Sequence, residues 1–242
     1  MKESQKYDIE FTSSTAIVPV SGRHPAAIEY PVPCYLIQTD DGKNILIDSG
    51  LPEATRIPSD EPVVLDKNVI EQLALIGLQP GDIDMLISSH FDFDHAGHHG
   101  AFPDAELIVQ RRHYEYAFTS DRCAVTRPEW DQPLERYRLI DGDMQLLPGL
   151  NLIETSGHVP GHQSVMVHLP ETGAVLITVD AVSNRGCFTP DHRAGSHEDA
   201  EAHHLSMLKL LDLVERKPVS LVIFGHDAEQ WQSLKKSPDF YT

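Results

Sequence analysis

The sequence is short of positive charge, of cysteine and of long apolar runs, and each shortage excludes a class of protein. Its 19 lysine and arginine residues stand against 37 aspartate and glutamate residues, which gives a net charge of −18 at pH 7 with histidine neutral. A surface this acidic repels phosphate backbones, so we expect no nucleic-acid partner. An anionic substrate would need local positive charge, which bound metal ions can supply.

The few cysteines and the apolar pattern bear on compartment and membrane association. Cys34, Cys123 and Cys187 form no C-x-x-C motif, which indicates a reduced, cytoplasmic protein rather than a disulfide scaffold. No apolar run reaches the roughly 18 residues that a membrane-spanning helix needs. The opening residues MKESQKYDIEF lack the apolar core of a signal peptide. We therefore expect neither a membrane span nor a secretory leader.

The overall composition is that of an ordinary globular protein. Hydrophobic residues make up 40% and charged residues 23% of the 242 positions, and no repeat or low-complexity block interrupts them. A chain of this length can bury a substantial core. We expect a single domain over residues 1–242.

Apolar periodicity predicts alternating strands and helices. The runs 34–39 and 44–48 flank Asp40-Asp41-Gly42, which is typical of a β-hairpin. Further strands are expected over 84–88, 106–110, 151–155, 164–169, 174–180 and 219–224. Helical spacing predicts helices over 67–77 and over 197–215, the second with Leu205, Leu208 and Leu211 in the core.

Several predicted strands end within one to three residues of a histidine or aspartate. His90, His158 and His226 each follow such an end, and Asp180 closes the predicted strand 174–180. Layered α/β folds bring functional side chains together at the carboxyl ends of their strands. We therefore expect these four side chains to meet at one rim of the molecule.

The densest group of metal-binding residue types is His90-Phe91-Asp92-Phe93-Asp94-His95. In a loop, alternate side chains can point to one side while the phenylalanines pack behind them. Imidazole with carboxylate suits zinc, iron, manganese or cobalt. A cation would also relieve the repulsion between Asp92 and Asp94. The spacing favours a metal site over a polar surface loop.

This motif resembles the H-x-H-x-D-H signature of the metallo-beta-lactamase superfamily, with Asp92 where the second histidine usually stands. The resemblance extends over blocks 31–50, 88–102, 109–117, 154–164, 177–181 and 224–241. Within the superfamily, the pieces YRLIDGD, GHVPGHQS and GHDAEQWQ look most like the N-acyl-homoserine-lactone lactonase branch.

The resemblance implies a fold, a metal centre and a reaction. It implies an α/β fold of four layers, an αβ/βα sandwich, and two divalent metal ions, zinc in the first place and iron, manganese or cobalt otherwise. It assigns His90, Asp92 and His158 to one ion, Asp94, His95 and His226 to the other, and Asp180 to both. A metal-bridging hydroxide would open a lactone ring while Asp94 carries the proton. The chain has no G-x-S-x-G motif for a serine nucleophile.

Two departures from the family pattern keep other functions open. Asp92 replaces a neutral ligand with an anionic one, which favours a harder ion and resembles the H-x-E-x-D-H motif of flavodiiron proteins. Ser183 stands where the lactonases typically carry a tyrosine that faces the substrate carbonyl. The alternatives are a dinuclear hydrolase of another small ester or amide, a di-iron oxidative enzyme, and an inactive binding module.

The remaining expectations concern the surroundings of the site. His24, Tyr30 and Ser183 are candidates for contacts with a small-molecule substrate. His98, His99 and His162 are interpreted as supporting residues rather than ligands, and His203 and His204 as solvated residues of the acidic helix. A homodimer is the assembly we consider for a chain of this size.

Overall fold

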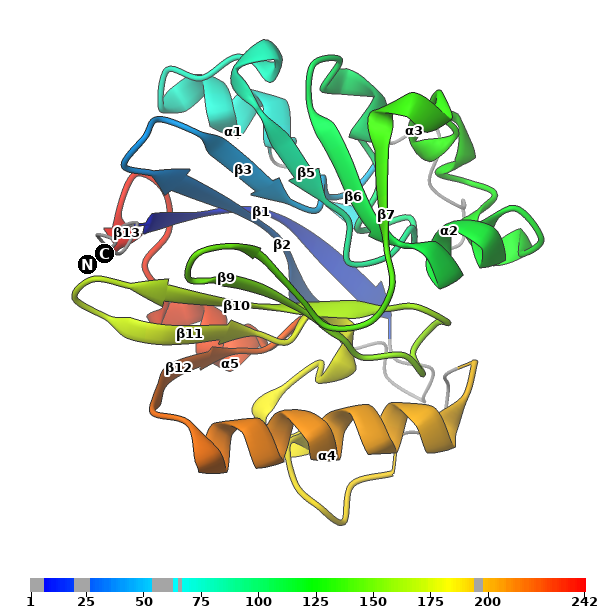
Figure 1. Cartoon of the computed structure of the whole chain (residues 1–242), viewed down its shortest axis with the longest axis vertical. Coiled ribbons are helices and arrows are strands. Elements are labelled where there is room, and N and C mark those ends of the chain that lie inside the picture. The colour runs from blue at the N-terminus through cyan, green and yellow to red at the C-terminus, as the bar shows by residue number, and fades with distance from the viewer. Residues whose placement is uncertain (1–6, 20–26, 54–62, 65–66, 194–197) are drawn as a thin grey trace.

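Two β-sheets face each other at the centre of the structure, and helices cover their outer faces (Figure 1). The computed structural model describes residues 7–19, 27–53, 63–64, 67–193 and 198–242. The predicted four-layer αβ/βα sandwich is confirmed. Within these ranges no helix is both long enough and apolar enough to span a membrane.

The first sheet has the strand order β13-β1-β2-β3-β5-β6-β7, with β4 paired to β1. The predicted hairpin is formed by β2 and β3, which pair antiparallel from Tyr35–Ile47 to Gln38–Asn44. Strands β3, β5, β6 and β7 run parallel. The bounds are β1 Tyr7–Pro19, β2 Ala27–Thr39, β3 Asn44–Ile47, β4 Val63–Val64, β5 Met85–Ile87, β6 Glu106–Gln110, β7 Tyr137–Ile140 and β13 Phe240–Tyr241.

The second sheet has the order β12-β11-β10-β9-β8. Its strands pair antiparallel from β8 to β11, while β11 and β12 run parallel. The bounds are β8 Met144–Leu147, β9 Leu150–Glu154, β10 Gln163–Leu169, β11 Gly173–Ile177 and β12 Val219–Ile223. The sequence predicted all of these strands except β8, and among the strands of the first sheet it missed β1, β4, β7 and β13.

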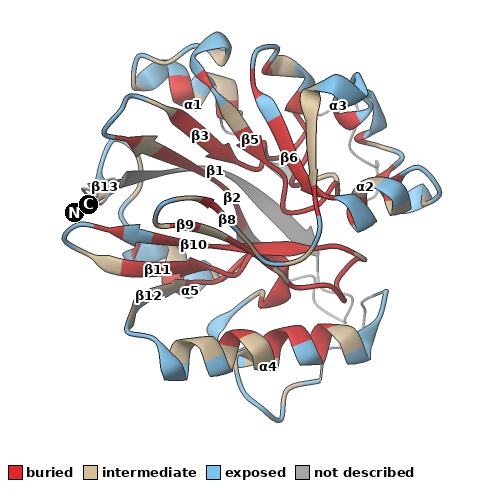
Figure 2. Cartoon of the chain, viewed as in Figure 1, coloured by how far each residue is buried: buried red, intermediate tan, exposed pale blue. Residues whose placement is uncertain are grey.

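The strands are apolar on both faces because both faces are covered. Along β3, Ile45 and Ile47 belong to the core between the sheets, whereas Leu46 packs beneath the helix α1, Val69–Leu75. Along β10, Val165 faces the same inner core and Met166 faces the outer helix layer. Side chains alternate between faces along a strand, so two covered faces require a continuous apolar run. Figure 2 shows the resulting band of buried residues through both sheets.

The long helix α4, Ala200–Arg216, covers the second sheet and corrects two expectations. Met207 and Leu210 are buried in the core, and the predicted core residues Leu208 and Leu211 pack partly buried against it, whereas Leu205, also predicted to be buried, is 56% exposed. His203 and His204, predicted to be solvated, are buried. The packed face of the helix therefore includes two of the three predicted leucines, and its histidine side meets the loops of the site.

Several shorter helices were not predicted individually from the sequence. The helix α2, Arg111–Ala117, follows β6, and α3, Arg127–Trp130, packs nearby on the first sheet (Figure 1). The helix α5, Ala228–Ser233, begins directly after the second sheet ends, and Trp231 from it packs against the inter-sheet core.

Close backbone approaches bring the loops of the two sheets together. A Cβ atom on Gly97 would lie 2.2 Å from the nitrogen of Pro52, so only glycine allows the loop after β5 to meet the loop after β3. A Cβ on Gly225 would lie 2.6 Å from the carbonyl oxygen of Val179. The absence of a side chain at Gly225 lets the end of β12 reach the segment that carries Asp180.

Candidate metal centre

Loops at one edge of the sandwich bring together two clusters of histidine and aspartate side chains. The first cluster consists of His90, Asp92 and His158. Its Asp92 Oδ2 lies 3.3 Å from His90 Nε2 and 3.1 Å from His158 Nε2. His90 and Asp92 come from the loop after β5 and His158 from the loop after β9, as the strand-end pattern predicted.

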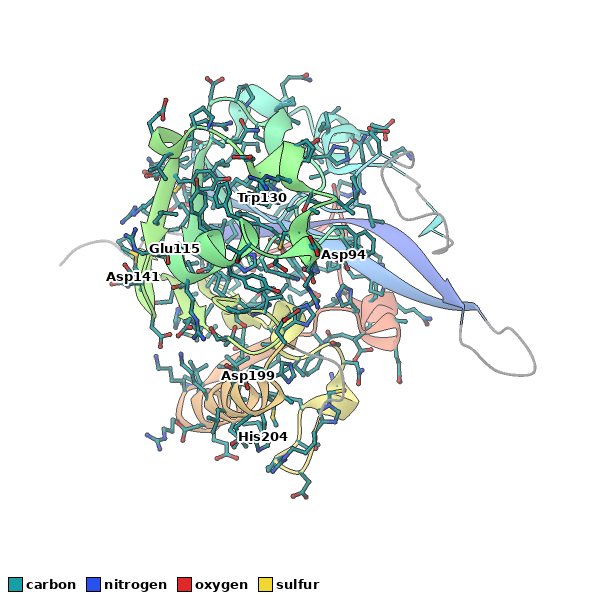
Figure 3. The ribbon with its side chains drawn as sticks, turned by 90° about the vertical axis from the view of Figure 1, so that its right-hand side faces the viewer. Asp94, Glu115, Trp130, Asp141, Asp199 and His204 are labelled. Carbon is teal, nitrogen blue, oxygen red and sulfur yellow. The ribbon has the colours of Figure 1, made fainter. Side chains whose placement is uncertain are left out.

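The second cluster consists of Asp94, His95 and His226. Asp94 Oδ2 lies 3.6 Å from His95 Nε2 and 3.9 Å from His226 Nε2. Figure 3 faces this side of the molecule, where Asp94 lies between the layer that carries Trp130 and the helix α4.

Asp180 lies between the clusters and offers one carboxylate oxygen to each. Its Oδ2 is 3.2 Å from His158 Nε2 in the first cluster, and its Oδ1 is 2.9 Å from His226 Nε2 in the second. A carboxylate with its two oxygens divided in this way can bridge two cations. All seven residues named from the sequence thus lie together in one place, and His90, His95 and Asp180 form a further group that spans the two clusters.

The donor atoms fit metal ions. Among the described residues, Nε2 of His90, Nε2 of His95 and Oδ1 of Asp180 are buried without a hydrogen-bond partner, although Asp180 Oδ1 lies 2.9 Å from His226 Nε2 as an ion pair. Buried polar atoms are nearly always hydrogen-bonded, so such a group points to a ligand. In a tetrahedral zinc site with bonds of about 2.0–2.1 Å, neighbouring ligand atoms lie about 3.3 Å apart. The separations in the first cluster match that spacing.

Hydrogen bonds from outside the clusters orient the imidazole rings. Asp48 accepts a bond of 2.9 Å from His95 Nδ1 and also bonds the backbone and hydroxyl of Ser89. Ser89 Oγ in turn accepts from His90 Nδ1 at 2.9 Å, and the carbonyl of Pro31 accepts from His226 Nδ1 at 2.8 Å. Each ring therefore turns Nε2 toward the clusters, as metal-binding histidines require.

Further histidines hold the loops rather than the clusters. His162, interpreted from the sequence as a supporting residue, accepts from the backbone N–H of Asp180 at 3.2 Å. His203 donates to the carbonyl of Asp180 at 3.3 Å, which explains why it is buried on α4. His99 lies between the hydroxyls of Ser49 and Ser88, each at 2.6 Å.

The carboxylates control the protonation of the clusters. Burial works to lower the pKa of His226, but Asp180 raises that pKa to about 9. Burial would raise the pKa of Asp180, yet His226, His95 and His158 hold it well below its ordinary range. A cation that binds His226 must displace its proton, so binding should tighten as the pH rises.

A pocket of about 400 Å³ opens over the centre. Its lining includes Asp94, Phe93 and Ser183, so Ser183 is at the site as expected. Of the other candidates for substrate contacts, His24 lies outside the described residues. For Tyr30 the structure describes only the backbone, which belongs to β2.

Arg122 is the site residue that the sequence analysis missed. Its Nε lies 2.7 Å from Asp92 Oδ1, and its Nη2 lies 2.9 Å from His158 Nε2. It also lines the pocket. The sequence offered only an indirect indication of Arg122. The negative charge of Asp92 favours a neighbouring cation, but the sequence does not show which residue or ion supplies it.

Comparison with known proteins gives the family. Residues 27–226 match the metallo-beta-lactamase superfamily. The chain belongs to this superfamily. Within it, the chain is 36% identical over 225 residues to an N-acyl homoserine lactonase of a Bacillus species, with 88% of each chain covered. It is 33% identical to the N-acyl homoserine lactonase AttM of Azorhizobium caulinodans, with 89% of each covered.

Solved structures of the superfamily agree with this placement. An N-acyl homoserine lactone hydrolase with the product N-hexanoyl-L-homoserine bound at its catalytic metal centre superposes with a TM-score of 0.84 at 30% identity, covering 98% of this chain and 100% of the other. A quorum-quenching N-acyl homoserine lactone lactonase gives 0.85 at 31% identity, with all of both chains covered. The resemblance to the superfamily and its lactonase branch is thus confirmed.

Proposed function

We propose that this chain is a metal-dependent hydrolase that opens the ring of a lactone, with N-acyl homoserine lactones as the substrate class. The observation that carries the proposal is Asp180, whose two oxygens face two histidine–aspartate clusters at the base of a pocket. The lactonase relatives, at 33–36% identity over most of the chain, supply the substrate class.

The cofactor in this proposal is a pair of divalent ions, with zinc as the first candidate. Bound at the two clusters, they would polarise the ring carbonyl and acidify a water molecule. His90, Asp92 and His158 would hold one ion, Asp94, His95 and His226 the other, and Asp180 both.

Asp94 is the residue we propose to move the proton. Hydrolysis joins the oxygen of water to the carbonyl carbon and breaks the bond to the ring oxygen, which must gain a proton. Asp92 is held by Arg122 and Asp180 is enclosed by histidines, whereas Asp94 lines the pocket without an arginine partner among its described contacts. Asp94 can take the proton of water and pass it to the ring oxygen.

The test is turnover by chelator-stripped protein reloaded with zinc, cobalt, manganese or iron. Substrates are N-acyl homoserine lactones, simple lactones, aryl esters and amides, followed by acid release and by the gain of one water in product mass. Chelator-sensitive turnover of lactones supports the proposal. Turnover of esters or amides alone would overturn the substrate class, and oxygen consumption by the iron form without hydrolysis would overturn the reaction.

Asp94→Asn provides the variant test, with Asp143→Asn on an exposed carboxylate as its control. We expect kcat to fall by about 10²–10⁴-fold in the first variant and to stay unchanged in the second. Equal activity of Asp94→Asn and the unmodified chain would remove Asp94 from the reaction.

A further inference from the structure

Arg122 binds two members of the first cluster at once. Its Nε lies 2.7 Å and 2.9 Å from the two carboxylate oxygens of Asp92, and its Nη2 lies 2.9 Å from His158 Nε2. Asp92 and His158 are themselves 3.1 Å apart. The guanidinium therefore contacts Asp92 and His158 at the same time, on one side of the first cluster.

The segment that carries Arg122 is packed against the loop that carries Asp92. Thr126 Oγ1 donates to the carbonyl of Phe91 at 2.6 Å, and the indole of Trp130 stacks on the ring of Phe91 with centroids 5.0 Å apart. Trp130 also donates to the carbonyl of Cys123 at 3.1 Å. These contacts are buried and fix the backbone beside Arg122, whose side chain, 32% exposed, is held by its bonds to the cluster.

We propose that the Arg122 guanidinium is a resident cation of the first cluster, and that a metal ion binds there only by displacing it from His158. This inference rests on the metal centre proposed above. A neutral imidazole has one lone pair, at the nitrogen that carries no proton. A metal ion at His158 Nε2 requires the tautomer with its proton on Nδ1, and in that tautomer the Nε2 lone pair accepts from Arg122 or binds the ion, but cannot do both.

Charge leads to the same conclusion. Asp92 adds a negative charge where the family pattern has a neutral imidazole, and Arg122 neutralises that charge. A divalent ion entering the first cluster meets a positive charge within a few ångströms. Among the described residues that line the pocket, Arg122 is the one arginine or lysine. The first cluster should therefore bind its metal ion more weakly than the second.

The experiment is a zinc titration of the chelator-stripped full chain, with affinities from competition against a chromophoric chelator and bound ions counted by native mass spectrometry. The variants are Arg122→Gln and, as a matched control, Arg127→Gln. Arg127 is a nearby exposed arginine paired with Asp131, so its loss changes the net charge equally. Circular dichroism verifies that each variant is folded.

We expect the unmodified chain to bind two zinc ions with affinities at least tenfold apart. Arg122→Gln should strengthen the weaker affinity at least tenfold and leave the stronger one unchanged, and Arg127→Gln should match the unmodified chain. An arginine that only orients Asp92 as a ligand predicts the opposite sign, because its loss would weaken the site. An unchanged or weaker second affinity in Arg122→Gln thus overturns the inference but not the metal centre, whereas a chain that binds no zinc overturns both.

A measurement on the unmodified chain keeps the inference testable if Arg122→Gln does not fold. The Nε–Hε NMR resonance of Arg122, assigned with Arg122→Lys, should stay unchanged through the first zinc equivalent and shift with the second. A shift complete at the first equivalent, or no shift at all, would overturn the displacement of Arg122.

Discussion

At the scale of single residues, the metal-binding atoms depend on side chains that never touch the substrate pocket. Asp48 accepts bonds from His95 and from both donors of Ser89, and Ser89 in turn orients His90. One buried carboxylate therefore aligns a ring in each cluster. Mutation of such outer partners typically lowers metal affinity about 10–100-fold.

Replacing that carboxylate tests this alignment. In Asp48→Asn one acceptor oxygen becomes a donor, so the bonds to His95 and Ser89 can no longer all form. We expect zinc affinity to fall about 10–100-fold, measured by chelator competition. Asp141→Asn, which alters an exposed carboxylate paired with Arg111, should change nothing. Equal affinities in the two variants would contradict the alignment role of Asp48.

His99 should make folding sensitive to acid. Burial lowers its pKa to about 4 from the ordinary value of 6.5. The unfolded chain therefore binds this proton first as the pH falls. The contribution of neutral His99 to the unfolding free energy is fully present above about pH 6.5. As the pH falls from 6.5 to 4, the unfolding free energy decreases by about 1.4 kcal/mol per pH unit.

The variant His99→Gln isolates that effect. Urea unfolding of chelator-treated protein at several pH values should show a shallower acid limb in the variant, because the group that titrates is gone. The difference between the two proteins cancels the titration of the other histidines. If the unfolding free energies of the two proteins changed in parallel between pH 6.5 and pH 4, His99 would not have a lowered pKa in the folded state.

At the scale of elements, α4 is fixed against the loop that carries His158. Gly157 has a φ of 136°, and a Cβ atom there would lie 2.0 Å from the backbone nitrogen of His203 on α4. Ser206 of α4 donates to the carbonyl of Ser156 at 2.6 Å. The helix therefore approaches the ligand loop as closely as a glycine permits.

Gly157→Ala should disturb both the helix and the metal centre. The neighbouring backbone must shift to accept the new methyl group, so we expect a loss of unfolding free energy above the roughly 1–3 kcal/mol of an unfavourable φ alone, together with weaker zinc binding. Gly142→Ala is the matched control, since Gly142 has a φ of 75° and nothing within 4 Å of the added atom. Chemical denaturation of both variants measures the difference, and equal losses would argue against the close approach.

At the scale of the whole molecule, the two sheets are joined at one edge by a concentration of charge. Three carboxylates, from Asp92, Asp94 and Asp180, converge within a chain of net charge −18. Divalent ions there would offset this repulsion while linking loops from both sheets. Metal binding and folding should therefore be coupled.

Metal removal tests that coupling. A ligand that binds only the folded state adds about 2.7 kcal/mol at 100 times its dissociation constant, so chelator treatment should lower the Tm and added zinc should restore it. Calcium, which prefers sites made entirely of oxygen ligands, serves as the control ion and should not restore it. A Tm indifferent to chelator would contradict a structural contribution from the metal centre.

The sequence by itself determined the residues of the centre and most of the strands. The motif from His90 to His95 lies within a single loop, so its residues are close in space whatever the fold. The run 44–48 has apolar side chains on both faces of a strand, which predicts a buried strand without knowledge of its neighbours. The family resemblance supplied the grouping into two sites. These features are local, or repeat a known pattern, and so they could be predicted.

Only the tertiary structure decided which distant side chains meet. Arg122 lies 30 positions from Asp92, and Asp48 lies 47 positions from His95. The burial of His203, wrongly predicted as solvated, depends on α4 docking at Gly157. No periodicity encodes such pairs, because they follow from sheet order and from backbone approaches that form only when the layers pack.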